Sequence, residues 1–409
     1  MSGPALDFAH LHTAVADLAH VGAIDGGGCA RLALTDEDKA GRDLVVSWMR
    51  AQGLTVHVDA IGNVFAMRPG REEGPPVMTG SHIDTVRTGG RFDGNLGVLA
   101  GLEVCRALDA AGITTRRPLC VAFFTNEEGA RFQPDMMGSL VHAGGLTLQE
   151  AWAATDGEGK RVGDELKRIG YRGSMTPGTI RPHAYVELHI EQGPVLEEAG
   201  ITIGAVTGVQ GISWTEVTVS GTSAHAGTTP MRLRHDAGYV AGLCSTFARR
   251  LTQDMGGAQV ATVGANELRP NLINVIANRA RFTLDLRNTD EALLKEAERR
   301  AFAFIDDAAR AEGCTVERRT LARFEPVEFA PDMIDRVEHL ARAHGRSVMR
   351  LPSGAGHDAQ MMARLCPTGM IFVPSVKGLS HNVAEFTHPG DIEAGAAILL
   401  DLMLELAQS

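Results

Sequence analysis

Imidazole and carboxylate side chains follow short apolar stretches at four places in this chain of 409 residues. They are His82 and Asp84 after residues 76–78, Glu127 and Glu128 after 121–124, His189 after 185–188, and His381 after 370–373. Nitrogen and oxygen donors without a thiolate suit Zn, Mn, Co or Ni ions better than Ca or an iron–sulfur cluster. A lone histidine or a Glu-Glu pair is ordinarily a surface or core feature, but four apolar stretches that end in the same way predict a metal centre.

Asp93 belongs to the same group of donors. It lies in residues 90–95, where glycines on both sides allow a tight loop. Five donors together with a bridging carboxylate are more than one tetrahedral ion needs, whereas two ions that share a carboxylate use them economically. The sequence therefore favours two divalent metal ions per subunit, Zn, Mn, Co or Ni.

The elements that must position these donors alternate between strand and helix patterns, which is typical of an α/β sheet. We expect strands at residues 76–80, 119–124 and 370–374, and a helix at 95–111. In an open α/β sheet, ligands bind beyond the carboxyl ends of the strands. The donors are therefore expected to meet in one crevice.

The middle of the chain has a different pattern. Residues 210–325 predict the order β-α-β-β-α-β, which is ferredoxin-like. We therefore expect an α/β fold in which a discontinuous α/β/α catalytic domain, residues 1–209 and 326–409, is interrupted by an inserted α+β domain at 210–325. Residues 207–211 are predicted to form a hinge between the domains, and the polar residues 155–182 to form a surface excursion.

Charge and composition exclude several classes of protein. The formal net charge of −11 disfavours nucleic acid and anionic membranes as partners. The six cysteines form no Cys-x-x-Cys pair, which indicates reduced thiols in a cytoplasmic protein. We find no signal peptide pattern and no apolar run of about 18 residues that would span a membrane. P-loop, nucleophile-elbow and His-Glu-x-x-His motifs are also absent from the sequence.

Six longer segments resemble the M20-type metallopeptidase clan, in order and over almost the whole chain. They are GSHIDTV (80–86), GGRFDGNLGVLAGLEV (89–104), FFTNEEGARF (123–132), LHIEQGPVLE (188–197), GTSAHAGTTPM (221–231) and GLSHNVAE (378–385). The closer likeness is to the amidohydrolase branch of N-carbamoyl-L-amino-acid hydrolases, β-ureidopropionases and allantoate amidohydrolases. His189, where peptidase members usually place Asp or Glu, and the adjacent Glu-Gln-Gly-Pro favour this branch.

The resemblance implies a ligand set for two ions. One ion is expected on His82, Asp93 and His189, and the other on Asp93, Glu128 and His381, with Asp93 bridging.

Two further carboxylates are assigned by the same resemblance. Glu127 is expected to act as the general base, with a spare-ligand role as the alternative. Asp84 is expected to orient a ligating imidazole through its carboxylate, and the alternative is a turn-capping aspartate.

The inserted domain is expected to complete the site in a homodimer. The resemblance implies that His225 reaches the neighbouring subunit's site and stabilises the oxyanion. The same resemblance implies that Arg287, Asn274 and Gln192 bind a substrate carboxylate, which an arginine can hold with two parallel hydrogen bonds. His357 is expected to line the pocket. For Arg287 a surface salt bridge remains the alternative.

The function that follows is hydrolysis of an N-carbamoyl-L-amino acid to the L-amino acid, ammonia and carbon dioxide. Allantoate amidohydrolase and β-ureidopropionase activities are the first alternatives. A dipeptidase or aminoacylase of the same clan is the next, and a non-catalytic dimeric binding protein is the last.

Overall fold

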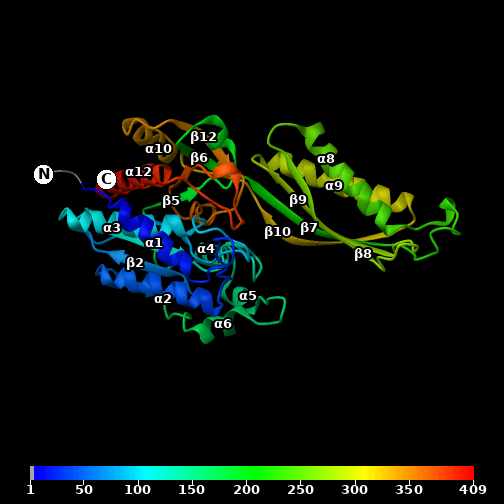
Figure 1. The fold of residues 1–409 in the computed structure, drawn as a ribbon, viewed down its shortest axis with the longest axis horizontal. Coiled ribbons are helices and arrows are strands. Elements are labelled where there is room, and N and C mark those ends of the chain that lie inside the picture. Colours follow the sequence, from blue (N-terminus) through cyan, green and yellow to red (C-terminus); the bar gives the residue numbers. More distant parts are fainter. Residues whose placement is uncertain (1–3) are drawn as a thin grey trace. The chain divides into compact units, whose positions relative to one another are not determined.

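The computed structural model describes residues 4–409, and the chain divides into two compact units. The first contains the chain up to Gly208 together with Glu328–Ser409, and the second contains Val209–Val327. Figure 1 follows the chain through both. The mixed α/β fold predicted from the sequence is confirmed.

A nine-stranded mixed sheet forms the centre of the first unit, in the order β1-β2-β4-β3-β5-β13-β6-β11 with β12 paired to β6. The strands are β1 (Thr55–Val58), β2 (Val64–Arg68), β3 (Val77–His82), β4 (Leu119–Phe124), β5 (Ala184–Ile190), β6 (Ile203–Val209), β11 (Val327–Glu328), β12 (Val348–Ser353) and β13 (Thr368–Val373). The neighbours β4, β3, β5 and β13 run parallel. Their carboxyl ends therefore share one edge of the sheet.

Ten helices accompany this sheet within residues 4–409. They are α1 (Phe8–His20), α2 (Asp36–Ala51), α3 (Asn95–Ala110), α4 (Met137–His142), α5 (Leu148–Ala153), α6 (Val162–Ile169), α7 (Val195–Ala199), α10 (Pro331–Ala343), α11 (Asp358–Met362) and α12 (Pro389–Gln408). The helices α3 and α12 contact each other and the central strands. None of the helices in the described part of the chain is both long and apolar enough to cross a membrane.

Two glycines let α3 lie close to the sheet. A Cβ atom at Gly97 would lie 2.5 Å from the carbonyl oxygen of Leu188, and one at Gly101 would lie 2.8 Å from a side chain of β3. Both separations are too short for a real side chain, so glycine is required. The helix begins at Asn95, directly after the loop that contains Asp93. Its close packing therefore holds Asp93 near the carboxyl ends of β3 and β5.

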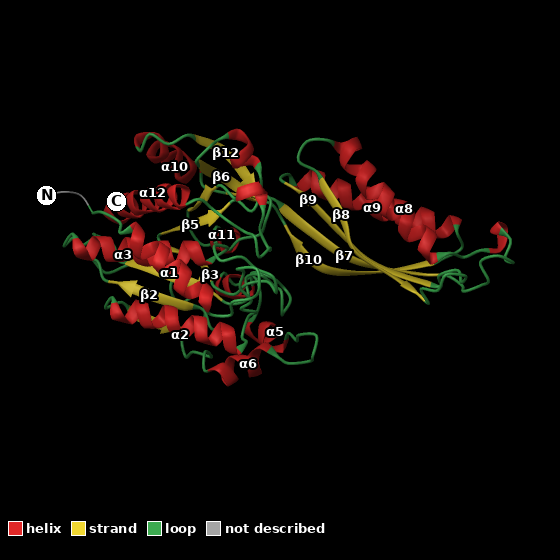
Figure 2. Ribbon diagram, viewed as in Figure 1, coloured by secondary structure: helices red, strands yellow, loops and turns green. Residues whose placement is uncertain are grey.

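The second unit is a four-stranded antiparallel sheet in the order β10-β7-β9-β8, with two helices on one face (Figure 2). Its elements are β7 (Gly211–Ser220), α8 (Ala237–Met255), β8 (Val260–Arg269), β9 (Arg279–Asn288), α9 (Glu291–Ala311) and β10 (Thr315–Phe324). Strand β9 alternates buried residues such as Phe282 and Leu286 with more exposed ones such as Arg281 and Arg287. This alternation is what a sheet covered on one face requires.

One local expectation needs correction. Residues 155–182 are not simply a surface excursion, because they include α6, whose Val162, Leu166 and Ile169 are buried. Periodicity over eight residues was too short a signal beside the surrounding polar residues. Within the predicted hinge, β6 ends at Val209 and β7 begins at Gly211, so this stretch is almost entirely strand, and the boundary between the two units lies inside it. A hinge motion here stays a prediction.

Candidate metal centre

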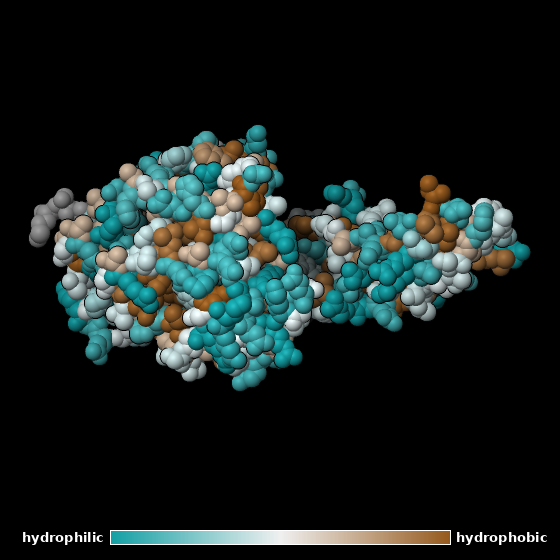
Figure 3. Space-filling model, turned by 60° about the horizontal axis from the view of Figure 1, so that its bottom comes forward, coloured by the Kyte–Doolittle hydropathy of each residue, from teal (hydrophilic) through white to brown (hydrophobic). Residues whose placement is uncertain are grey.

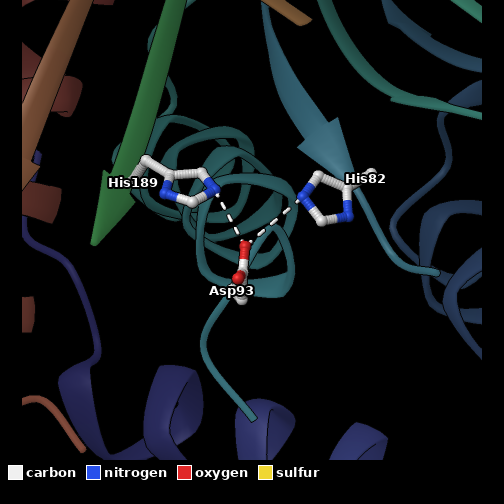
Figure 4. Close-up of side chains that lie close together, drawn as sticks. All are labelled: His82, Asp93 and His189. Atoms are coloured by element: carbon white, nitrogen blue, oxygen red, sulfur yellow. Dashed lines mark ion pairs between the residues drawn. The ribbon is translucent and has the colours of Figure 1, made fainter. Parts of the chain in front are cut away.

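Asp93 lies between the imidazoles of His82 and His189 (Figure 4). His82 is the last residue of β3, and His189 is the penultimate residue of β5. Nε2 of His82 lies 3.5 Å from Oδ1 of Asp93, and Nε2 of His189 lies 3.3 Å from the same oxygen. All three side chains are buried. The first predicted group of ligands is therefore brought together at the edge where the parallel strands end.

Backbone carbonyls orient both imidazoles. Nδ1 of His82 donates to the carbonyl oxygen of Asp84 at 2.9 Å, and Nδ1 of His189 donates to the carbonyl oxygen of Ile190 at 2.8 Å. A carbonyl oxygen only accepts, so each neutral ring has its lone pair on Nε2, the atom that faces Asp93. Fixing the second nitrogen in this way is how proteins orient histidine ligands.

A second group of donors forms on the other oxygen of Asp93. Nε2 of His381 lies 3.5 Å from Oδ2 of Asp93 and 3.1 Å from Oε2 of Glu128. Oε1 of Glu128 accepts from the backbone N–H of Val86 at 3.2 Å. The imidazole of His381 is half-exposed, whereas the carboxylates are buried. The two oxygens of Asp93 thus face different imidazoles, as a bridging carboxylate must.

Glu127 lies beside the first group. Its Oε2 is 3.3 Å from Nε2 of His82, and its side chain is 8% exposed. Burial raises the pKa of Glu127 well above its usual range, and the nearby carboxylates of Asp358 and Glu128 raise it further. A carboxyl group with a raised pKa is suited to taking up and releasing a proton near neutral pH.

Burial and charged partners act in opposite directions on the pKa values of the first group. Burial disfavours the charge on Asp93, but the facing imidazoles of His189 and His82 hold its pKa well below its usual range. Burial also disfavours charge on His82, but Glu127 and Asp93 raise its pKa well above its usual value. The charges of these groups therefore depend on one another.

The structure corrects the expected role of the Asp84 side chain. Its backbone carbonyl, not its carboxylate, accepts from His82. The carboxylate instead accepts from the backbone N–H groups of Glu127 and Glu128, at 3.3 and 3.4 Å. The reason is that these two backbone N–H groups already engage the carboxylate. Asp84 therefore holds the backbone that carries Glu127 and Glu128.

Gln192 and His357 also lie at this centre. The side-chain amide of Gln192 donates to Oδ2 of Asp93 at 2.9 Å. The ring of His357 packs 4.5 Å from the ring of His189, and its Nε2 lies 2.8 Å from the hydroxyl of Ser353. Burial lowers the pKa of His357 well below its usual value, and the imidazole of His189 lowers it further. Both effects disfavour the charged form of this imidazole.

The remaining three predicted residues lie in the second unit. His225 and Asn274 are exposed on adjacent loops, where the N–H of Ala226 donates to the carbonyl of Asn274 at 2.9 Å. Arg287 lies on β9 and its guanidinium is bound to the carboxylate of Asp285, with Nη2 to Oδ2 at 2.9 Å. The structure thus contains the salt bridge that is the alternative role of Arg287. The guanidinium of Arg287 is also partly exposed.

The tautomer of His225 follows from its neighbours. Its Nδ1 accepts from the backbone N–H groups of Gly227 and Thr228, at 3.0 and 3.2 Å. In the neutral ring the proton is then on Nε2. His225 therefore offers an exposed N–H donor.

Three residues at the centre were missed from the sequence. Oε1 of Glu187, two residues before His189 in β5, accepts from Ser81 at 2.6 Å, and its Oε2 accepts from the N–H of Ala359 at 2.8 Å. Ser380 and Glu385 contact Asp93 from the loop that carries His381. For Glu187, the sequence does offer a signal: a carboxylate within an otherwise apolar strand indicates a buried polar role. The other two lie within segments already singled out, but nothing in their spacing distinguished them.

Left-handed backbone conformations cluster around the centre. Asn126, Gln192 and His381 have φ values of 56°, 59° and 54°. Residues with side chains rarely adopt this region, and such strain concentrates at functional sites. These left-handed residues turn the chain sharply just beside Glu127 and at His381.

The donors present fit divalent metal ions. Among residues 4–409, ligand atoms lie within 4.8 Å of one another in the groups His82–Asp93–His189, Asp93–Glu128–His381 and Glu187–His189–His357. The first two share Asp93 and contain only imidazole and carboxylate. In the third, the carboxylate of Glu187 is already held by Ser81 and Ala359. The first two groups are therefore the candidate metal centre.

Comparisons with known proteins agree with the predicted family. The model of peptidase family M20/M25/M40 matches residues 78–405. The chain is 43% identical over 395 residues to the N-carbamoyl-L-amino-acid amidohydrolase of Rhizobium meliloti, which covers 96% of this chain and 94% of that protein. It is 41% identical over 409 residues to the N-carbamoyl-L-amino acid amidohydrolase of Geobacillus stearothermophilus, covering 96% and 97%.

Solved structures give the same result. An amidase of the hydantoinase/carbamoylase family from Burkholderia multivorans aligns with a TM-score of 0.91 and 45% identity, covering 99% of each chain. The resemblance predicted from the sequence motifs is confirmed. The chain belongs to peptidase family M20/M25/M40.

Proposed function

We propose that the protein hydrolyses the linear carbamoyl C–N bond of an N-carbamoyl-L-amino acid and releases the L-amino acid, ammonia and carbon dioxide. The observation that carries the proposal is Asp93, whose two oxygens face two separate groups of ligand atoms. The relatives in Rhizobium meliloti and Geobacillus stearothermophilus, which carry the name of this activity, support the substrate.

Two divalent ions are the proposed cofactors, with Zn, Mn, Co or Ni as candidates. His82, Asp93 and His189 would hold one, and Asp93, Glu128 and His381 the other. Bound there, the ions would lower the pKa of the attacking water and polarise the carbamoyl carbonyl.

Glu127 is the proposed general base. It belongs to neither group of ligand atoms, and it is buried beside them. Its carboxylate would take a proton from the attacking water and deliver it to the leaving nitrogen of the amino acid. Asp84 supports this role, since it holds the backbone N–H of Glu127.

The second unit is proposed to act as a dimerisation and lid domain. Four of its hydrophobic residues are fully or largely exposed: Ile273 and Leu272 on a loop, and Met231 and Leu233 in the short 3-10 helix Met231–Leu233. Hydrophobic side chains stand out among hydrophilic neighbours on its surface (Figure 3). Exposed hydrophobic groups of this kind mark surfaces that bind a partner. A second copy of the chain would cover them in a homodimer.

His225 is proposed to act across that homodimer. Its Nε2–H is exposed, and Asn274 is on the adjacent loop, next to Ile273. Placed in the site of the other subunit, this N–H would stabilise the negative charge on the carbonyl oxygen in the transition state.

Mixing two inactive variants tests this arrangement. After subunit exchange between Glu127→Gln and His225→Ala dimers, each hybrid has one site with both residues intact. Hybrids form half of an equimolar mixture, so about a quarter of the wild-type activity is expected to return. Mixing Glu127→Gln with Glu128→Gln is the control, because both residues belong to one subunit's centre and no recovery is expected. A verified exchange without recovery in the first mixture contradicts the arrangement.

Arg287, Asn274 and Gln192 are proposed to bind the substrate carboxylate. Arg287 and Asp285 share one face of β9, and the guanidinium carbon lies 5.7 Å from the centre of the Trp214 ring. The arginine is therefore held in a defined orientation by an acid and an aromatic ring, which favours planar recognition of a carboxylate.

Arg287→Ala is expected to raise KM for carboxylate substrates about ten- to a hundredfold, because charge-assisted hydrogen bonds contribute about 1.5–3 kcal/mol. The bound metal is expected to be unchanged. Arg281→Ala is the matched control, since Arg281 is an exposed arginine on the same face of β9, and its KM should equal that of the wild type. The experiment is steady-state kinetics with metal analysis; equal KM values in both variants would remove Arg287 from the site.

A substrate panel tests the function itself. Ammonia release is measured with N-carbamoyl-L-amino acids, β-ureidopropionate and allantoate, on protein loaded with Mn, Co or Zn, and N-acyl amino acids and dipeptides are followed by amino acid release. We expect the highest kcat/KM with an N-carbamoyl-L-amino acid. A higher value with allantoate or β-ureidopropionate would assign the chain to those activities, and preference for a dipeptide or N-acyl substrate would overturn the proposal.

A further inference from the structure

Two neutral donors hold the oxygen of Asp93 that faces His381. The hydroxyl of Ser380 lies 2.8 Å from Oδ2 of Asp93, and the amide of Gln192 donates to the same oxygen at 2.9 Å. Oδ1, in contrast, faces His82 and His189. Both of these neutral donors therefore act on the Oδ2 side of the carboxylate.

Glu385 holds the same aspartate from behind. Its Oε1 accepts from the backbone N–H groups of Phe92 and Asp93, at 3.0 and 3.2 Å. Its Oε2 lies 3.0 Å from the hydroxyl of Ser380. Glu385 is 3% exposed. One buried carboxyl group thus contacts both the backbone of Asp93 and the hydroxyl that touches its side chain.

The contact requires a glycine in the Asp93 loop. A Cβ atom at Gly90 would lie 2.1 Å from the carboxyl group of Glu385. Such a distance is far inside van der Waals contact, so any side chain at position 90 would displace Glu385. This close approach explains why position 90 must be a glycine. The need for a flexible loop would not by itself explain it.

Glu385 also links two segments that carry ligands. It lies four residues after His381, and its hydrogen bonds reach a loop almost three hundred residues earlier in the chain. His381 is the half-exposed member of the second group. Within residues 4–409, the structure gives its ring no hydrogen bond to a backbone carbonyl of the kind that orients His82 and His189. The second group is therefore the one that depends on such a link.

We propose that Glu385 and Ser380 are positioning residues that aim Oδ2 of Asp93 at the metal ion held by Glu128 and His381, and thereby set the affinity of this second ion. The inference rests on the two-ion centre of the proposed function. Neither residue is a ligand or touches the reacting atoms. They act by hydrogen bonding, and the negative charge of Glu385 is not required.

Metal titration of the apo protein tests the proposal. Stepwise affinities for Zn²⁺ and Co²⁺ are measured by competition with a chromophoric chelator and by calorimetry. In Glu385→Ala, the affinity for the second ion is expected to fall about ten- to a hundredfold, the usual effect of removing a partner of a metal ligand. The affinity for the first ion is expected to stay within about threefold, because carbonyls orient His82 and His189.

Glu385→Gln is the decisive control. Its amide oxygen still accepts from the N–H groups of Phe92 and Asp93, and its NH₂ group donates to the Ser380 oxygen, which leaves the hydroxyl proton for Asp93. Both affinities are therefore expected to match the wild type. An equal loss in the Gln and Ala variants would mean that charge is what matters, and would overturn the proposal.

Two further variants keep the proposal testable even if the Glu385→Ala protein does not fold. Ser380→Ala removes only the hydroxyl, and Gly90→Ala displaces the Glu385 carboxyl; both are expected to weaken the second ion selectively, by about tenfold or more. Unchanged second-ion affinity in folded Ser380→Ala and Gly90→Ala protein would contradict the proposal. Wild-type protein that binds no ion would instead contradict the proposed function, so the two failures are distinguishable.

Discussion

Replacing Glu127 with glutamine is expected to lower kcat by about two to four orders of magnitude while both metal ions stay bound. Glutamine has nearly the same shape as glutamate, but it cannot take a proton from water. Glu127 belongs to neither group of ligand atoms around Asp93, so the metal content is expected to equal that of the wild type. The measurement is kcat for the preferred substrate together with elemental analysis of the same sample.

The adjacent glutamate provides the matched control. Glu128→Gln makes the same chemical change one residue further along, where the carboxylate lies 3.1 Å from His381. This variant is expected to lose affinity for the second ion, in contrast to Glu127→Gln. Near-normal kcat in fully metallated Glu127→Gln protein would remove Glu127 as the general base, and metal loss in that variant would make it a ligand.

Asp93→Asn is expected to abolish binding of both ions and to reduce activity by at least about three orders of magnitude, or about 4 kcal/mol in the activation free energy. Asp93 is the one side chain shared by both ligand groups. An asparagine keeps a single carbonyl oxygen, and its NH₂ group would face either the imidazoles on the Oδ1 side or His381 on the Oδ2 side. Metal content and kcat are measured on the purified variant.

Glu385→Gln is the comparison for this prediction, because it also converts a buried carboxylate at the same loop to an amide. It is expected to retain both ions, which would show that Asp93→Asn acts through ligation and not through disruption of the loop. Folding is followed by circular dichroism. Asp93→Asn protein that still binds two ions tightly would rule out a bridging role for Asp93.

Much of the fold and the metal centre followed from local patterns. Short apolar stretches, each followed by a histidine or a pair of acids, predicted β3, β4 and β13 to within about two residues. Because parallel strands end at one edge of a sheet, the sequence alone predicts that His82 and Glu127 lie near each other. The glycines beside Asp93 likewise predicted its loop.

Other features were not visible in local patterns. The eight residues of α6 lie in a polar stretch, and their amphipathic face was too short to stand out. The expected contact between the Asp84 carboxylate and His82 was wrong, because the direction of a side chain in a turn depends on backbone torsions. The roles of Ser380 and Glu385 required knowing which loop packs against Asp93.

The identity of the donors, their place at strand ends and the family were thus contained in the order of residues, since strands, turns and metal donors are chosen by side-chain type. Which oxygen of Asp93 faces which imidazole was decided by the folded chain. That choice depends on hydrogen bonds from Gln192 and Ser380 and on the carbonyls behind His82 and His189. Gln192, Ser380 and Ile190 are about a hundred or more residues from Asp93 in sequence, and only tertiary packing brings them to this centre.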